Sequence, residues 1–235
     1  MFIPLYDHNP LIHVTRPYVN YALIAVTGLV FVMTGAFGDE YLQQAAFSLG
    51  LVPSVVNDIK ELPASYVWIP EDASYVSYAF LHSSLIHLAG NMVFLWVFGD
   101  NIEDAVGHAK YLVFYLLCAA AAGFAHTLIN PQSEIPLIGA SGAVSGIVGA
   151  YLMLHPRVRV WVLLLGQIPL PLSAAVILGF WLLYQIYSFI NSYYVESQVS
   201  WPAHIGGFIA GALLIVILRR KDIPLFDRDL AVQEG

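Results

Sequence analysis

A serine stands among small residues in the stretch Gly139–Gly146, which reads Gly-Ala-Ser-Gly-Ala-Val-Ser-Gly. Such neighbours leave the Ser141 hydroxyl uncrowded, and they also let another helix backbone come close, as small residues do in membrane-protein interfaces. A hydroxyl becomes a good nucleophile when a nearby base removes its proton, and histidine is the usual base near neutral pH. On its own, this stretch therefore fits either a helix-packing face or the site of a nucleophile.

A histidine with glycines on the same helical face occurs later in the chain. His204 is followed by Gly207 and Gly211, three and seven positions on, so a helix would place all three on one side. Packing this face against the small residues around Ser141 would bring the histidine next to the serine. A histidine inside hydrocarbon is costly and is a functional candidate for that reason. The glycines expected at the helix contact are Gly139, Gly142, Gly146, Gly207 and Gly211.

Two polar side chains near the start of another apolar segment could donate hydrogen bonds. His87 and Asn91 are four residues apart and share a helical face, whereas His82 and His87, five apart, do not. This spacing, with no accompanying glutamate, argues against a His-x-x-x-His zinc site. The single cysteine, Cys118, excludes a cysteine-based metal site and an intramolecular disulfide. The pair suits either donation to a developing oxyanion or polar contact between helices.

The composition indicates the surroundings in which these residues work. Of the 235 residues, 59% are hydrophobic and 11% are charged, about half the charged share of an ordinary soluble domain. A chain of this size cannot hide so much apolar surface from water, so we expect it to lie in a lipid bilayer. The formal net charge of −7 matters less here than where each sign falls, and we expect no nucleic-acid partner.

Apolar segments separated by charged or proline-bearing breaks predict six membrane spans. They lie at 18–36, 82–99, 110–129, 140–155, 172–190 and 202–218, and the further apolar stretch 161–170 is interrupted by prolines. The fourth span is short, because from Ser141 to His155 a helix measures about 22 Å against about 30 Å of hydrocarbon. If its inner end reaches the membrane surface, Ser141 lies below the outer surface, where irregular backbone is tolerated only inside protein or beside water.

The basic residues set the orientation of these spans. All nine Lys and Arg residues except Lys60 fall on the side that holds both termini, and the positive-inside rule assigns that side to the cytoplasm. We expect 1–17 to be a cytoplasmic N-terminal segment, 18–218 the six-helix domain and 219–235 a cytoplasmic tail, mobile from Asp222 onward. The acidic connection 37–80 holds prolines beside apolar clusters, so we expect a folded, membrane-associated outer loop.

The motifs Gly139-x-Ser141-Gly142, Ala203-His204-x-x-Gly207-x-x-x-Gly211 and His82-x-x-x-x-His87-x-x-x-Asn91 stand on the predicted spans. Together they resemble the rhomboid family of intramembrane serine proteases, and the likeness covers roughly residues 18–218. The resemblance implies an all-α polytopic membrane protein, a six-transmembrane-helix rhomboid-like bundle with a large membrane-associated first outer loop.

The resemblance also implies a role for each candidate residue. Ser141 would be the nucleophile and His204 the general base, while His87, Asn91 and the backbone N–H of Ser141 would form the oxyanion hole. No Asp or Glu within the predicted spans lies near His204 in the sequence, which favours a Ser–His dyad over a triad. The enzyme would use no cofactor and no metal. It would cut transmembrane segments of other membrane proteins near their outer ends, admitting them laterally near the second and fifth spans.

The sequence departs from the family pattern at two places. Ala73 and Ser74 stand where some members carry a Trp-Arg pair in the first loop. Ser145 stands where some members place an aromatic ring against the catalytic histidine, which leaves open what positions His204. His126, near the outer end of the third span, is expected to be a packing or interfacial residue.

Two other functions compete with proteolysis. One is a catalytically inactive rhomboid-like binder of membrane clients, which the presence of both Ser141 and His204 disfavours. The other is a small-solute channel or transporter, for which the expected ionisable pathway residues are missing from the spans. The plain six-span layout without a transit peptide favours a bacterial inner membrane. The sequence names neither the substrate nor the oligomeric state.

Overall fold

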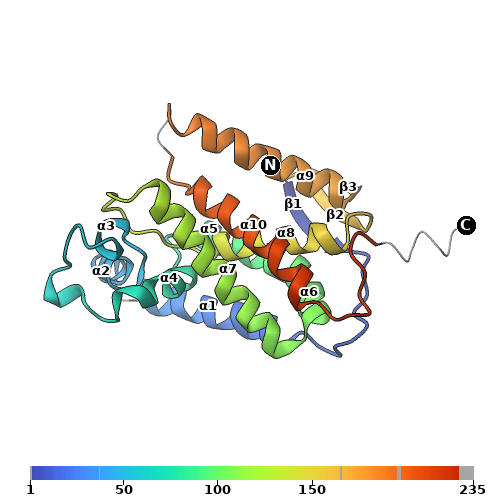
Figure 1. The fold of residues 1–235 in the computed structure, drawn as a ribbon, viewed down its shortest axis with the longest axis horizontal. Helices are drawn as coiled ribbons and strands as arrows, with labels where there is room; N and C mark the ends of the chain where they lie inside the picture. The colour runs from blue at the N-terminus through green and yellow to red at the C-terminus, as the bar shows by residue number, and fades with distance from the viewer. Residues whose placement is uncertain (1, 37, 165, 195–196, 228–235) are drawn as a thin grey trace, which may run out of the picture.

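The structure is a computed structural model that describes residues 2–36, 38–164, 166–194 and 197–227. Most of this part of the chain is helical, and a small antiparallel sheet lies beside the start of the helix α9 (Ala174–Asn191) (Figure 1). The long helices are α1 (Tyr18–Ala36), α7 (His108–Ile129), α8 (Ser141–Leu154), α9 (Ala174–Asn191) and α10 (Trp201–Leu218). A further continuous helix is built from α5 (Leu85–Phe94), the π-helical η4 (Leu95–Gly99) and α6 (Asp100–Val106).

Five of these helical stretches are long and apolar enough to cross a membrane. They are Tyr18–Gly35, Leu85–Val106, His108–Ile129, Ala174–Asn191 and Trp201–Leu218. The sixth apolar helix, α8, has only 14 residues, so it measures about 21 Å. Large apolar side chains on the helix surfaces are exposed, among them Ile86 at 85% and Ile217 at 78%. Exposed large apolar side chains on all of these long helices fit contact with lipid.

The second span is longer than the predicted segment 82–99, and its prediction was wrong at the far end. The charged residues that suggested a break lie inside the helix, where their carboxylates are hydrogen-bonded. Glu103 accepts the backbone N–H groups of Val19 and Asn20 in the first turn of α1, at 3.0 and 2.7 Å. Those N–H groups have no partner within their own helix, so the buried carboxylate replaces the missing carbonyls.

The prediction of an all-α fold was also wrong in one region. The strands β1 (Phe2–Asp7), β2 (Arg159–Leu164) and β3 (Ile168–Ser173) form an antiparallel sheet in the order β1-β2-β3. Along β2, Val160 and Val162 are fully buried, as alternate residues on one face of a strand can be. The prolines at 169 and 171 lie on β3, an edge strand, where a missing N–H is tolerated.

The connection 37–80 is folded in its described part, residues 38–80, with five short elements after the helix α2 (Asp39–Leu49). These are α3 (Pro53–Val56), η1 (Ala64–Tyr66), η2 (Glu71–Ala73) and α4 (Ser74–Ser77), followed by η3 (Tyr78–Phe80). They gather at the end of the molecule away from the sheet (Figure 1). Whether this part touches the membrane stays a prediction.

The centre of the bundle is α8, which is buried from Gly142 to Tyr151. In Figure 1, α10 and α7 lie across it. A Cβ atom added at Gly207 would stand 2.0 Å from the carbonyl oxygen of Gly142, and one at Gly211 would stand 1.9 Å from that of Gly146. These distances are far below a van der Waals contact, so the two backbones pack without any intervening side chain.

The first part of the predicted mobile tail is packed against the bundle, so that prediction was wrong for residues 222–227. The N–H groups of Phe226 and Asp227 donate to the carbonyls of Met153 and Leu154 at 2.8 and 3.0 Å. The Asp227 carboxylate also lies 3.1 Å from Nδ1 of His155. Residues 228–235 of the predicted tail lie outside the described residues.

His13 links the N-terminal segment to the chain that follows α10. Its Nε2 atom lies 2.8 Å from the Asp222 carboxylate, and its Nδ1 atom lies 3.4 Å from the Asp104 carboxylate on α6. The hydrogen bond to Asp222 raises the pKa of His13 above its ordinary value, more than burial lowers it. The same hydrogen bond lowers the pKa of Asp222. The contact therefore favours the charged forms of both partners.

The His13 contact predicts a pH-dependent loss of stability on substitution. Because the folded-state pKa of His13 is raised, its contribution is present below about pH 6.5 and is lost as pH rises through that pKa. Because the pKa of Asp222 is lowered, its contribution is present above about pH 4 and is lost as pH falls. In detergent, His13→Gln should lower the melting temperature at about pH 5 and change it little at about pH 9. An equal loss at both pH values would contradict this assignment, and Asp222→Asn should reproduce the His13→Gln pattern.

The glycine contact predicts that Gly207→Val separates α8 from α10. The new side chain would overlap the Gly142 carbonyl, and overpacking of this kind costs about 1–3 kcal/mol or more. Thermal unfolding in detergent should show a clearly lower melting temperature for this variant. Gly28→Val on α1 is the matched control, because no atom stands within 4 Å of its Cβ position. Equal melting temperatures for the two variants would contradict the contact.

Candidate functional site

Ser141 is the first residue of α8. Helix N-termini expose unpaired backbone N–H groups and the positive end of the helix dipole, so these groups surround the serine. Within the part of the chain that the structure describes, the Ser141 hydroxyl has no hydrogen-bond partner, and its side chain is half-buried. Its carbonyl oxygen accepts the Ser145 hydroxyl at 2.7 Å. The Ser141 hydroxyl, unlike that of Ser145, is therefore available for another partner.

Gly139, two residues before the serine, was predicted to lie at the contact of two glycine faces, but it lies against the side chain of His87 on α5 and not at the contact between α8 and α10. Its φ of +122° is one that other residues rarely adopt, and an added Cβ would stand 2.7 Å from Nε2 of His87. Its N–H donates to the carbonyl of Tyr78 at 3.0 Å. The glycine therefore lets the imidazole of His87 lie directly over the loop that enters α8.

His82 lies beside His87, which corrects the prediction from helical spacing. It precedes α5, so the 3.6-residue period does not apply to it, and the two ring centroids are 4.9 Å apart. Its Nε2 atom accepts a hydrogen bond from the side-chain amide of Asn91 at 2.9 Å and a longer one from the N–H of Ala140 at 3.4 Å. This leaves Asn91 with one further N–H to donate.

His204 lies in the first turn of α10, whose N-cap Ser200 accepts the N–H of Ala203 at 3.3 Å. The Ala203 carbonyl stands 3.7 Å from the Cβ position of Gly142. The residue before the histidine thus touches the residue after Ser141, so the two candidate residues stand at facing helix starts. No hydrogen bond joins the Ser141 hydroxyl to His204 in the described structure, and such bonds are often long in enzymes without substrate.

Three side chains hold the His204 ring. Nδ1 lies 2.7 Å from Oε1 of Gln185 on α9. The Trp181 ring is stacked on it, with centroids 6.4 Å apart and planes at 23°, and the Trp201 ring meets it edge-on at 5.8 Å. Ser145 stands where some family members place an aromatic ring against the histidine, and here the rings around His204 come instead from α9 and from α10 itself.

Sequence reasoning missed Gln185 as a site residue. The signal was present, because this amide stands within the otherwise apolar span 172–190. A polar side chain at that depth needs a partner, and Gln185 is only 3% exposed. Its partner could not be named from the sequence, since the register of α9 against α10 is not a local property.

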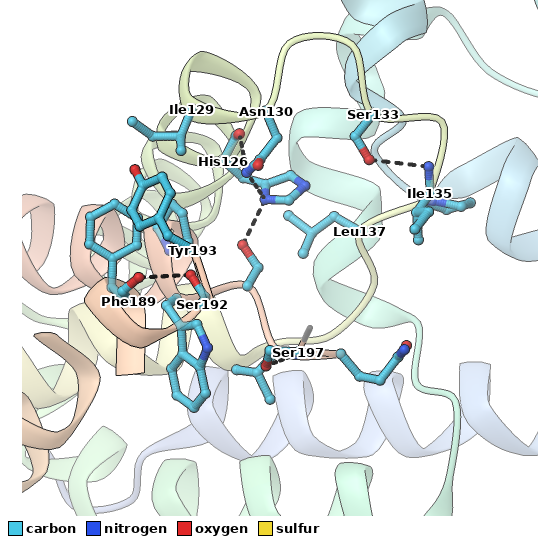
Figure 2. Close-up of a pocket in the computed structure, with 16 residues that line it drawn as sticks. His126, Ile129, Asn130, Ser133, Ile135, Leu137, Phe189, Ser192, Tyr193 and Ser197 are labelled. Atoms are coloured by element: carbon cyan, nitrogen blue, oxygen red, sulfur yellow. Dashed lines mark hydrogen bonds between the residues drawn. The ribbon is translucent and has the colours of Figure 1, made fainter. Parts of the chain in front are cut away.

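An open cavity of about 290 Å³ lies beside the site. Figure 2 shows His126 and Asn130 at the end of α7, Ser133, Ile135 and Leu137 from the following loop, and Phe189, Ser192 and Tyr193 at and just after the end of α9. His126 was expected to be a packing or interfacial residue. Its Nδ1 atom lies 2.7 Å from the hydroxyl of Ser200 (Figure 2). The cavity therefore opens between the loop that leads to Ser141 and the turn that leads to His204.

Among the described residues, no group of three or more His, Cys, Asp or Glu side chains is placed to hold a metal ion. Cys118 is buried, and its sulfur stands 2.5 Å from the Cβ position of Gly146. It fills space between α7 and α8.

The sequence is similar to that of rhomboid proteins. The Rhomboid domain matches residues 70–221. Rhomboid protein 1, mitochondrial, of Saccharomyces cerevisiae is 25% identical over 215 residues, covering 89% of this chain and 58% of that protein. Rhomboid-like protease 3 of Toxoplasma gondii is 30% identical over 153 residues, covering 64% of this chain and 54% of that protein. Rhomboid protease GlpG of Yersinia pestis is 28% identical over 140 residues, covering 60% of this chain and 46% of that protein.

The chain spans about half the length of the curated relatives it matches. The domain match is the stronger finding, because it covers well over half of this chain and includes His82, His87, Asn91, Ser141 and His204. With its apolar helices and this domain, the chain is an integral membrane protein that belongs to the rhomboid family.

Proposed function

We propose that this protein is an intramembrane serine endopeptidase that cleaves transmembrane segments of membrane proteins near their outer ends with a Ser141–His204 dyad. The observation that supports this most directly is the contact of α8 with α10 through glycine, because it sets the serine and the histidine at facing helix starts. Relatives named as proteases support the same reaction class.

The proposed reaction is acyl transfer to serine followed by hydrolysis. The Ser141 oxygen attacks the carbonyl carbon of the scissile peptide bond while His204 takes the hydroxyl proton. His204 then gives that proton to the leaving amine, and the C–N bond breaks. A water molecule, deprotonated by the same imidazole, attacks the acyl ester and releases the carboxylic acid product with free Ser141.

The negative oxygen of each tetrahedral intermediate would be held by three donors. They are the backbone N–H of Ser141, the imidazole of His87 and the side-chain amide of Asn91. The short separation of Gly139 and His87 supports a place for that imidazole beside the reacting carbonyl. The hydrogen bond from Asn91 to His82 fixes the plane of the amide and leaves its second N–H for the oxyanion.

The arrangement in the membrane is part of the proposal. The five long spans and α8 would cross the bilayer with both termini in the cytoplasm, on the side with most of the basic residues. Because α8 measures about 21 Å in about 30 Å of hydrocarbon, Ser141 would lie below the outer surface. The cavity beside His126 would supply water there. The plain six-span layout favours a bacterial inner membrane, and the catalytic domain would occupy residues 18–218.

A serine-reactive fluorophosphonate tests the nucleophile in the full-length protein. Wild type should be labelled and should cleave some members of a panel of single-span proteins in liposomes, whereas Ser141→Ala should do neither. Ser145→Ala is the matched control, because it removes a neighbouring hydroxyl of the same helix and should keep labelling. If wild type shows neither labelling nor cleavage, the protein is an inactive binder. Solute flux that survives Ser141→Ala would instead indicate a channel.

Asn91→Ala should slow turnover without abolishing it. Loss of one oxyanion donor costs about 3–4 kcal/mol, or roughly a hundredfold to a thousandfold in kcat, and KM should change little because the donor acts on the intermediate. Kinetics on a cleaved single-span substrate would measure this. His82→Leu keeps the donor but removes its support, so it should have a smaller effect. An unchanged kcat in Asn91→Ala would rule out the oxyanion role.

A further inference from the structure

We propose that Gln185 is the positioning residue of the catalytic base, holding His204 in the tautomer that leaves Nε2 free to receive the Ser141 proton. This inference rests on the proposed function. It names a third member of the site, on a helix separate from the nucleophile and the base.

The geometry is specific for one atom of the imidazole. Oε1 of Gln185 lies 2.7 Å from Nδ1 of His204, a short distance for a neutral N–H···O hydrogen bond. Gln185 is 3% exposed, and this is the hydrogen bond that its side chain makes within the described structure. A buried amide oxygen that accepts only this bond has one clear structural task, which is to satisfy and orient that ring nitrogen.

The tautomer follows from the chemistry of the two groups. A neutral imidazole carries one proton, and an amide oxygen can only accept, so the proton of His204 must be on Nδ1. Nε2 then has a free lone pair, which is the form that a general base requires. In Ser-His-Asp enzymes a carboxylate holds Nδ1 for the same purpose, and replacing it so that the wrong tautomer forms is highly damaging.

The rings around His204 limit its rotation but do not choose between its nitrogens. Trp181 lies over one face of the imidazole and Trp201 meets it edge-on. Trp181 and Gln185 are four residues apart, so they project from one face of α9. The indoles fix the plane of the ring, and the amide determines which nitrogen faces α9.

An amide is also suited to this depth. A carboxylate at the same position would be stabilised by the imidazolium during reaction but would have to be buried as a charge between turnovers, which is costly. The amide avoids that cost and gives up part of the charge stabilisation. Losing it should therefore reduce the rate by less than the roughly 10⁴-fold effect of altering a charged orienting group.

Two substitutions at Gln185 separate orientation from packing. Gln185→Met keeps the length of the side chain and removes the amide oxygen, whereas Gln185→Glu keeps an acceptor oxygen. Ser188→Ala is the matched control, since Ser188 is the next buried polar residue of α9 and makes no hydrogen bond to His204 in the described structure. The readouts are the rate of fluorophosphonate labelling of Ser141, kcat and KM for a cleaved single-span substrate, and the melting temperature.

We expect Gln185→Met to lower both the labelling rate and kcat by about tenfold to a hundredfold, with KM within about twofold of wild type. Gln185→Glu should recover most of both rates, and Ser188→Ala should match wild type. Labelling is informative because the probe is small and reports activation of Ser141 without entry of a transmembrane substrate.

Three results would overturn the inference while leaving the proposed function in place. They are wild-type labelling by Gln185→Met, a change confined to KM, and an equal loss in the Met and Glu variants together with a lower melting temperature. A wild-type protein that neither labels nor cleaves would instead overturn the proposed function itself, and the role of Gln185 with it.

Discussion

The close approach of α8 and α10 is the constraint on which the rest of the structure depends. Two carbonyl oxygens of α8 occupy the space that side chains at Gly207 and Gly211 would need. In lipid no hydrophobic force drives helices together, so close backbone packing must supply much of the association. Because side chains do not separate the helices, the distance between their starts is fixed by backbone dimensions alone, and flexible rotamers cannot change it.

A second constraint comes from the helix ends, where backbone N–H groups lack partners. The protein satisfies them with side chains brought from distant parts of the sequence. Glu103 accepts the N–H groups of Val19 and Asn20 in the first turn of α1, and the neighbouring Asp104 accepts those of Ile12, His13 and Val14 in the irregular segment before that helix. These two carboxylates of the second span therefore hold in place the start of α1 and the segment before it. The charged residues that resembled a break in the span have this structural role.

Much of this architecture could be predicted from local patterns. The first span was predicted as 18–36, and α1 has these bounds because an uninterrupted apolar stretch determines both of its ends. The short fourth span was equally visible, between Gly139 and the residue before Pro156. What failed depends on distant partners. β2 and β3 form a sheet with β1, the first strand of the chain. The local sequence around 161–170 does not include β1, so it could not show that a partner strand exists. The failure at His82 has a different cause: this residue precedes α5, so the helical period that was applied to it does not hold there, and its contact with Asn91 was missed.

The environment of His204 shows how one structural problem determines a whole set of neighbours. A histidine that acts as a general base, as proposed for His204, must be neutral before the reaction and must present one nitrogen in one direction. Aromatic rings restrict its plane without adding charge, and a neutral amide accepts from one nitrogen without adding charge either. The Trp181 and Gln185 side chains meet both requirements from a single face of α9. The place of that helix against α10 therefore determines the orientation of the His204 ring, just as Gly207 and Gly211 of α10 determine how closely its helix approaches the helix of Ser141.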